Sequence, residues 1–237
     1  MIGIRADANV KIAMGHIMRC LSIANQLKEL GEDVVFFTSG DYAVDYIKSK
    51  GFECVIMPYE YKNKEEEIYE FINIVSDKNI SMVLLDSYEV TEKYMTQLNK
   101  IIKVAYIDDL NMFKYSADLI INYTYNTGMS LYNNWNYNLA DTKFLLGSKY
   151  IPLRREFSNS IIMYNYEVKK IFITTGGADE YNMLLEILHE LCIPKWSKIE
   201  KLVIAGKFYE HIAELRALEK CEASVKVYHD ISDMAGV

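Results

Sequence analysis

The chain has 237 residues, 51% of them hydrophobic, and a formal net charge of −7. This length suits one large domain or two modest ones, with enough apolar residues to fill their cores. The acidic balance and the lack of any run of Lys and Arg argue against a nucleic-acid partner, because phosphate binding needs clustered cations.

Neither a membrane segment nor a secretory signal is expected. No stretch approaches the roughly 18–20 apolar residues that span a bilayer, and Arg5 and Asp7 interrupt the apolar start of the chain. The four cysteines are scattered with no C-x-x-C pair, which is typical of free thiols in a reducing compartment. We therefore expect a cytoplasmic protein with no membrane partner.

The first part of the chain alternates apolar strands with amphipathic helices. This alternation predicts right-handed βαβ crossovers and a parallel sheet, and so an α/β fold. The charged run 64–67 is interpreted as a solvent-exposed helix face. The predicted strands are 1–6, 32–38, 53–57, 81–86, 103–107, 119–122 and 143–147. The predicted helices are 15–30, 41–50, 63–76 and 91–101. Residues 123–141 are predicted to form a long loop or a short helical crossing.

The alternating pattern restarts after a predicted linker, residues 158–167. Two βα units and one strand follow, which amounts to half of a Rossmann domain, so the C-terminal domain is expected to be truncated. The predicted domains are therefore residues 1–157 and an incomplete domain, residues 168–237. The predicted strands of this part are 168–174, 201–205 and 224–228. Three helices are predicted: one that ends at 191, one over 208–218 and one that begins at 231.

The loop between the first strand and the first helix is a candidate site, because open α/β sheets bind ligands at the carboxyl ends of their strands. It carries Arg5, Asp7, Gly15 and His16. His16 falls in the first helical turn, where the partial positive charge disfavours the imidazolium and leaves a ring able to act as a base. A turn residue or a helix cap is the more common role for such a histidine, so both interpretations stay open. The loop matches neither a P-loop nor a dinucleotide fingerprint.

Other polar residues follow the ends of strands in the same predicted sheet. Asp86, Tyr88, Asp108 and Asn122 should lie with His16 along one edge, where structural and functional roles are equally plausible for the aspartates. Adjacent carboxylates on a strand point to opposite faces. The neighbouring residues Asp108 and Asp109 are therefore not expected to act as an acid–base pair. No metal-ligand cluster is visible, and we predict neither a metal nor a cofactor.

A second candidate for anion binding is the Gly176-Gly177 loop. Glycines at the start of a helix leave backbone N–H groups free for a phosphate. The same Thr-Gly-Gly sequence is also an ordinary turn from a strand into a helix, and that interpretation stays open beside the first.

The combined motifs resemble one family. Arg5-x-Asp7 followed by Ile12-x-x-Gly15-His16-x-x-Arg19-Cys20 resembles the UDP-sugar hydrolases of pseudaminic acid biosynthesis, which release UDP and the free sugar from UDP-2,4-diacetamido-2,4,6-trideoxy-β-L-altropyranose. The resemblance covers essentially the whole chain. Further matches, in order, are Asp86-x-Tyr88, Asp108-Asp109, Leu146-Gly147-x-x-Tyr150, Leu153-Arg154-x-Glu156-Phe157 and Gly176-Gly177-x-Asp179-x-x-Asn182.

The resemblance implies two Rossmann-like domains of the glycosyltransferase B type and an inverting hydrolysis without metal. His16 would be the general base that activates water for attack at the anomeric carbon. A UDP-sugar is then the expected small-molecule partner, and the oligomeric state is left open. The predicted substrate-binding residues are Asp7, Gly15, Tyr88, Gly176, Gly177, Asp179 and Asn182.

Two departures from the family pattern bear on this expectation. The family loop is usually Gly-x-Gly-His, whereas this chain has Ala13 at the first glycine, which is expected to tighten the turn. The nucleotide-binding half of the family would lie beyond Val237. Two other functions therefore stay open: a glycosyltransferase of the same fold that uses a UDP-sugar, and a non-catalytic module that binds a nucleotide sugar.

Overall fold

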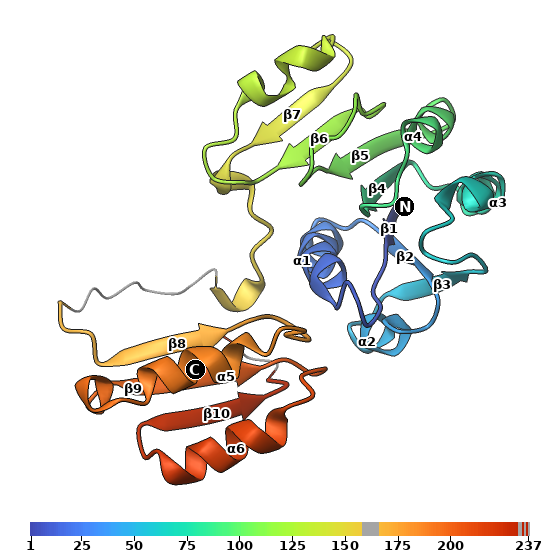
Figure 1. The fold of residues 1–237 in the computed structure, drawn as a ribbon. Coiled ribbons are helices and arrows are strands. Elements are labelled where there is room, and N and C mark those ends of the chain that lie inside the picture. Colours follow the sequence, from blue (N-terminus) through green and yellow to red (C-terminus); the bar gives the residue numbers. More distant parts are fainter. Residues whose placement is uncertain (158–165, 232–233, 235, 237) are drawn as a thin grey trace. The chain divides into compact units, whose positions relative to one another are not determined.

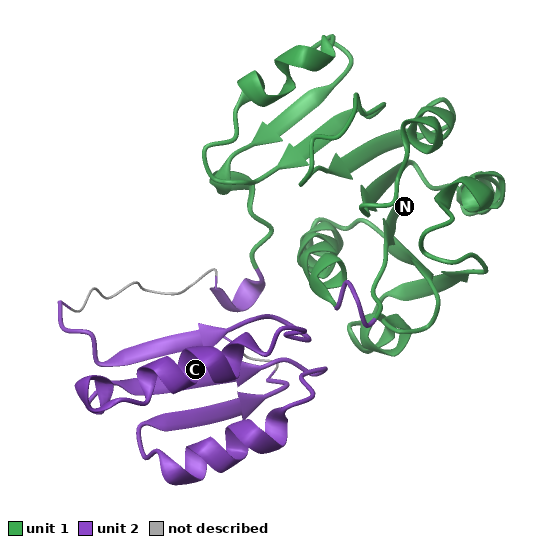
Figure 2. Ribbon diagram, in the orientation of Figure 1, with its two compact units in different colours: residues 1–9, 14–153 green, residues 10–13, 154–237 purple. Residues whose placement is uncertain are grey.

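The computed structural model describes residues 1–157, 166–231, 234 and 236. The chain forms two compact units, unit 1 with residues 1–9 and 14–153 and unit 2 with residues 10–13 and 154–237 (Figure 2). The predicted linker lies largely outside the described residues, so the predicted domain boundaries stay predictions. No helix in the described part of the chain is both long and apolar enough to cross a membrane.

Unit 1 is built on one parallel sheet of seven strands (Figure 1). The strands are β1 (Ile2–Ala6), β2 (Val34–Ser39), β3 (Glu53–Met57), β4 (Met82–Asp86), β5 (Lys103–Ile107), β6 (Leu119–Asn122) and β7 (Lys143–Leu146). They lie in the order β3-β2-β1-β4-β5-β6-β7, and every neighbouring pair is parallel. The predicted parallel α/β architecture is confirmed.

Helices cover both faces of this sheet, because successive side chains of a strand point to opposite faces and each face is apolar. Phe36 of β2 belongs to the core that includes Ile17 of the first helix. Its neighbour Phe37 belongs to the opposite core and meets the Phe71 ring edge-on at 5.1 Å. The elements between the strands are α1 (Gly15–Glu29), α2 (Val44–Ser49), α3 (Lys64–Asp77), α4 (Glu92–Asn99) and the 3-10 helix η1 (Met129–Trp135).

Unit 2 holds a smaller parallel sheet in the order β10-β9-β8 (Figure 1). Its strands are β8 (Lys170–Thr174), β9 (Glu200–Ala205) and β10 (Val225–His229), and its α-helices are α5 (Met183–Leu191) and α6 (Ile212–Cys221). Leu188 of α5 and Leu215 of α6 are fully buried in a core shared with Val203. The helix predicted to begin at 231 lies largely outside the described residues, so it stays a prediction.

The charged run at the start of α3 is not the exposed face that its composition predicts. Lys64 and Glu67 are 1% and 0% exposed, and only Glu65 and Glu66 between them face solvent. Residues three positions apart share one face of a helix, and here that face turns toward the sheet. The expectation is wrong because a buried arginine of β1, Arg5, pairs with Glu67 on this face.

Arg5 joins β1 to α3 through a bidentate pair. Its Nε and NH2 atoms each donate to Glu67 at 2.9 Å, and its NH1 donates to Asp7 at 2.6 Å. Lys64 completes the cluster by donating to Asp7 at 2.6 Å. Two cations thus meet two carboxylates out of contact with water, and each charge is compensated by hydrogen bonds.

Removing one carboxylate should leave a buried cation without its partner. We expect Glu67→Gln to lower the free energy of unfolding by about 3–5 kcal/mol, because Arg5 would lose its bidentate anion. Urea unfolding followed by circular dichroism measures the change. Glu66→Gln is the matched control, since Glu66 is exposed on the same helical turn and its loss should cost less than about 0.5 kcal/mol. Equal small effects in both variants would contradict the prediction.

Candidate functional site

The candidate site of unit 1 lies at the carboxyl ends of β1, β4, β5 and β6. The strand order reverses between β1 and β4, since β2 and β3 lie on one side of β1 and the later strands on the other. Ala6 and Asp86, the last residues of β1 and β4, are register partners. Such a reversal point is where open α/β sheets bind ligands, so the candidate site is narrowed to the neighbouring ends of β1 and β4.

His16 lies in the first turn of α1 and is held by Asp86. Its Nδ1 atom is 2.6 Å from Asp86 Oδ1, and the two residues are 6% and 0% exposed. The Tyr88 ring packs edge-on against the imidazole, with ring centroids 4.7 Å apart. A carboxylate can only accept, so Nδ1 carries the proton and Nε2 is the nitrogen that can take up another.

Arg19, one helical turn after His16, holds the same carboxylate. Its Nε donates to Asp86 Oδ2 at 2.6 Å and its NH2 donates to Oδ1. The guanidinium also donates to the Tyr123 hydroxyl at 2.6 Å and to Asp109 Oδ2 at 2.7 Å. Burial by itself would raise the pKa of Asp86, but the hydrogen bonds from Arg19 and His16 outweigh it and lower that pKa. Asp86 is therefore an ionised, buried carboxylate.

Tyr88 lies at the exposed border of this cluster. Its side chain is 45% exposed, and its hydroxyl donates to Asp109 Oδ2 at 3.0 Å. Partial burial, together with the negative charge of Asp109, raises the pKa of Tyr88 to about 12. The residue therefore presents a neutral phenol, which can donate or accept a hydrogen bond but does not act as a base near neutral pH.

Cys20 also contacts Asp86, but its thiol is not suited to nucleophilic chemistry. The Sγ atom donates to Asp86 Oδ2 at 3.3 Å, and the residue is fully buried. Burial and the neighbouring carboxylate raise the pKa of this thiol well above its usual value. The reactive form of cysteine is the thiolate, so Cys20 serves as a hydrogen-bond donor here.

Asp108 and Asp109 belong to different surroundings, as the alternation of side chains along a strand predicts. Asp108 is fully buried and accepts hydrogen bonds from the hydroxyls of Tyr115 at 2.8 Å and Tyr132 at 2.6 Å. Asp109 faces Arg19 instead. The two carboxylates do not form an acid–base pair, and Asp108 instead anchors the aromatic side chains beside β5 and β6.

The structure places Asp7 away from any open surface. It is 1% exposed, and it accepts hydrogen bonds from Arg5, Lys64 and the backbone N–H of Ser39. Both carboxylate oxygens are thus engaged by the protein. In this structure Asp7 supports the loop after β1, and its predicted substrate-binding role stays a prediction.

Gly15 and Ala13 define the backbone just before His16. Gly15 is the first residue of α1, and no described atom lies within 4 Å of the position a Cβ would take there. Ala13 has φ +51°, in the left-handed region that glycine adopts at no steric cost. The alanine therefore holds a turn that the family motif builds with glycine. The substrate-binding role of Gly15 stays a prediction.

In unit 2 the predicted substrate residues form the turn between β8 and α5. Gly176 has φ +88°, and a Cβ on Gly206 would collide with the carbonyls of Gly176 and Gly177, so the turn packs directly on that glycine. Asp179 accepts hydrogen bonds from the first two backbone N–H groups of α5, each at 2.9 Å. Asn182 accepts from a tyrosine hydroxyl. Their contacts with substrate stay predictions.

Sequence reasoning left two members of the site of unit 1 without a role. Arg19 entered only as part of the family motif, although its spacing of three from His16 places both on one helix face. Tyr123 follows β6 directly, in the segment that the sequence predicts to be a long loop or short helical crossing. No group of three or more His, Cys, Asp or Glu side chains could hold a metal ion in the described part of the chain.

No protein-family model matches the chain. It is 28% identical to an uncharacterised protein of Methanocaldococcus jannaschii, over 99% of this chain and 49% of that protein, so it spans about half the length of this relative. It is 23% identical to the UDP-2,4-diacetamido-2,4,6-trideoxy-β-L-altropyranose hydrolase of Campylobacter jejuni, over 98% of this chain and 78% of the hydrolase. It is also 23% identical to the spore coat polysaccharide biosynthesis protein SpsG of Bacillus subtilis, over 100% of this chain and 68% of SpsG.

Solved structures share the fold at low sequence identity. A glycosyltransferase of Rickettsia africae matches with a TM-score of 0.59 and 14% identity, over 99% of this chain and 69% of the enzyme. The UDP-GlcNAc 2-epimerase of Neisseria meningitidis, solved with UDP-GlcNAc, matches with a TM-score of 0.55 and 11% identity, over 99% of this chain and 73% of the epimerase. These matches confirm the predicted α/β fold of the glycosyltransferase B type.

The buried setting of Asp7 predicts how stability depends on pH. Burial alone would raise the pKa of Asp7, but Arg5 and Lys64 lower it from 3.8 to about 2. The unfolded chain therefore binds this proton first as the pH falls, and the contribution of Asp7, about 2 kcal/mol above pH 4, is lost between about pH 4 and pH 2.

Urea unfolding of the wild type and of Asp7→Asn from pH 7 to pH 2.5 measures this contribution. The variant should be less stable by at least about 2 kcal/mol at pH 7, and the difference should shrink below pH 4. Asp141→Asn is the control, because Asp141 is exposed in a turn and its loss should change stability by less than about 0.5 kcal/mol. A difference that stays constant at all pH values would contradict the assignment.

Proposed function

We propose that the chain hydrolyses a UDP-linked diacetamido-trideoxyhexose at its anomeric C–O bond, without a metal, and releases UDP and the free sugar for nonulosonate biosynthesis of the pseudaminic acid type. The observation that carries the proposal is the buried contact of 2.6 Å between His16 Nδ1 and Asp86. The match to the Campylobacter jejuni hydrolase over 98% of this chain supports the substrate class.

The proposed reaction is an inverting displacement by water. Nε2 of His16 takes a proton from the water as its oxygen attacks C1 of the sugar. The bond between C1 and the phosphate oxygen breaks, and its electron pair leaves with UDP, which is a good leaving group. Because Nδ1 donates to Asp86, the imidazolium that forms has an anion beside it.

Tyr88 is the proposed contact to substrate nearest the base in unit 1. Its ring packs on His16, while its half-exposed phenol is neutral and bound to Asp109. A neutral hydroxyl beside the base suits an acetamido or hydroxyl group of the sugar, since its oxygen can accept a hydrogen bond while its own proton is donated to Asp109. Gly176, Gly177 and Asn182 of unit 2 are also proposed to bind substrate, because they match the motif of the hydrolase family.

Two alternatives remain candidates. A glycosyltransferase would move the sugar from UDP to an acceptor, and one of the solved structures that share the fold is a glycosyltransferase. A non-catalytic module would bind the nucleotide sugar and leave it intact. Water and an acceptor hydroxyl attack the same carbon, so the base alone does not separate the first two functions.

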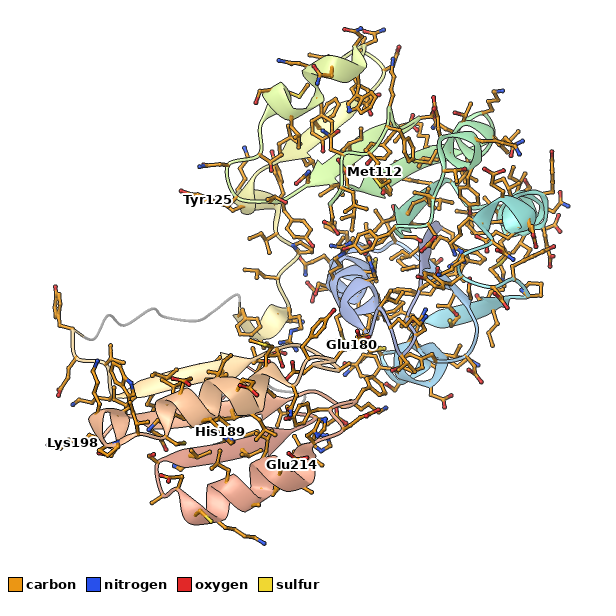
Figure 3. All side chains as sticks on the ribbon, viewed as in Figure 1. Met112, Tyr125, Glu180, His189, Lys198 and Glu214 are labelled. Atoms are coloured by element: carbon orange, nitrogen blue, oxygen red, sulfur yellow. The ribbon has the colours of Figure 1, made fainter. Side chains whose placement is uncertain are left out.

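A proton NMR time course of the UDP-sugar with purified protein tests the proposal. We expect the anomeric signal of the free sugar to appear without any acceptor, and His16→Asn to slow its appearance by at least about 100-fold, because the general base is lost. His189→Asn is the matched control, since His189 lies on α5 of unit 2 with an exposed side chain (Figure 3). It should leave the rate unchanged.

The other outcomes separate the alternatives. Release of UDP only in the presence of an acceptor would favour the glycosyltransferase. Saturable binding of the UDP-sugar with no release would favour the binding module. Equal rates for the wild type and His16→Asn would rule out the proposed mechanism.

A further inference from the structure

We propose that Asp86 and Arg19 are positioning residues that hold His16 with its proton on Nδ1 and its base nitrogen, Nε2, free for the reaction. This inference rests on the proposed function and deepens it. It starts from the arrangement of the two side chains around the imidazole, which are supplied by the end of β4 and by α1.

Arg19 fits this role because every nitrogen of its guanidinium is engaged. Nε and NH2 hold the two oxygens of Asp86, NH2 also donates to Asp109, and NH1 donates to Tyr123. The planar fork of arginine can make all these contacts from one position. A lysine carries the same charge at a single nitrogen and cannot hold both oxygens of Asp86 together with Tyr123.

The position of Asp86 decides which nitrogen of His16 carries the proton. Asp86 Oδ1 lies 2.6 Å from Nδ1, and an ionised carboxylate accepts hydrogen bonds but cannot donate them. The neutral ring is thereby restricted to the tautomer with a lone pair on Nε2. Without this restriction both tautomers would be populated, and a share of the molecules would present an N–H group to the water.

Three titratable or charged side chains of unit 1 are in direct contact with His16. Asp86 contacts it from β4, Arg19 from α1 and the Tyr88 ring from the segment after β4. Cys20 and Asp109 act through these neighbours, since they bond to Asp86 and to Arg19. Asp86 is thus the anion in direct contact with the ring, and its removal should make the imidazolium less stable.

Arg19 also joins the base to the proposed substrate contact. Through Asp109 it fixes the carboxylate to which the Tyr88 hydroxyl donates, and through Asp86 it fixes His16. One guanidinium therefore sets the distance between the base and the phenol. Its loss should lower kcat more than it raises KM, because it disturbs the alignment of the base more than the binding of the substrate.

The first experiment reads the tautomer directly and needs no activity. Long-range ¹H–¹⁵N spectra of the wild-type protein are recorded above the titration of its histidines, and the His16 signals are assigned by their loss in His16→Asn. We expect neutral His16 to carry its proton on Nδ1 in the wild type. In Asp86→Asn we expect a mixture of tautomers or the Nε2–H form, because the amide can donate to Nδ1.

The second experiment uses kinetics with the UDP-sugar. Arg19→Lys keeps the charge and should lower kcat by about 10- to 100-fold, with KM changed by less than about threefold. Asp86→Asn should lower kcat further and move the acidic limb of the kcat/KM profile to lower pH, since the imidazolium loses its anion. Arg216→Lys is the matched control, because Arg216 is a half-exposed residue of α6 that pairs with Glu219, and it should leave kcat unchanged.

The outcomes distinguish this inference from the proposed function. A wild-type His16 with its proton on Nε2 would overturn the inference even if UDP is released. The Nδ1–H form in the wild type, shifted in Asp86→Asn, would support it even if the protein hydrolyses no UDP-sugar. An Arg19→Lys variant that matches the wild type in kcat and in its pH profile would also overturn it. Because Arg19→Lys retains the Asp86 carboxylate, it tests the inference even if Asp86→Asn fails to fold.

Discussion

The buried carboxylate of Asp86 is the group on which the candidate site depends. It has no exposed surface and accepts hydrogen bonds from His16, Arg19 and Cys20. A carboxylate removed from water stays charged only where protein donors replace its hydration. Two of these donors, His16 and Arg19, are the residues of the proposed mechanism, so the requirement to satisfy one buried carboxylate also fixes their positions.

Unit 1 contains two charged clusters that differ in their access to solvent. The cluster of Arg5, Lys64 and Glu67 is sealed, with exposures of 0%, 1% and 0%, and it ties β1 to α3. The cluster around Asp86 reaches the surface through Tyr88, which is 45% exposed. A reaction needs both a charged group out of water and a path for the substrate, and only the second cluster combines them.

Local pattern was enough to predict much of the fold. The strands at 53–57, 103–107 and 119–122 match β3, β5 and β6 at both ends, because each is an apolar run bounded by turn residues. The helix predicted at 208–218 begins only at Ile212, since the preceding turn bonds through the Phe208 N–H to the Gly177 carbonyl. That contact joins distant residues, and no local signal reports it.

The sequence by itself determined the alternation of strands and helices, the histidine at the start of α1 and the polar residues at the ends of the strands, because each follows from periodicity and local propensity. Only the tertiary structure decided that His16 pairs with Asp86, 70 residues away, and that Lys64 and Glu67 turn inward. The physical reason is the order of the strands. With β4 beside β1, the ends of the two strands lie side by side, and a buried arginine on β1 draws the charged face of α3 to itself.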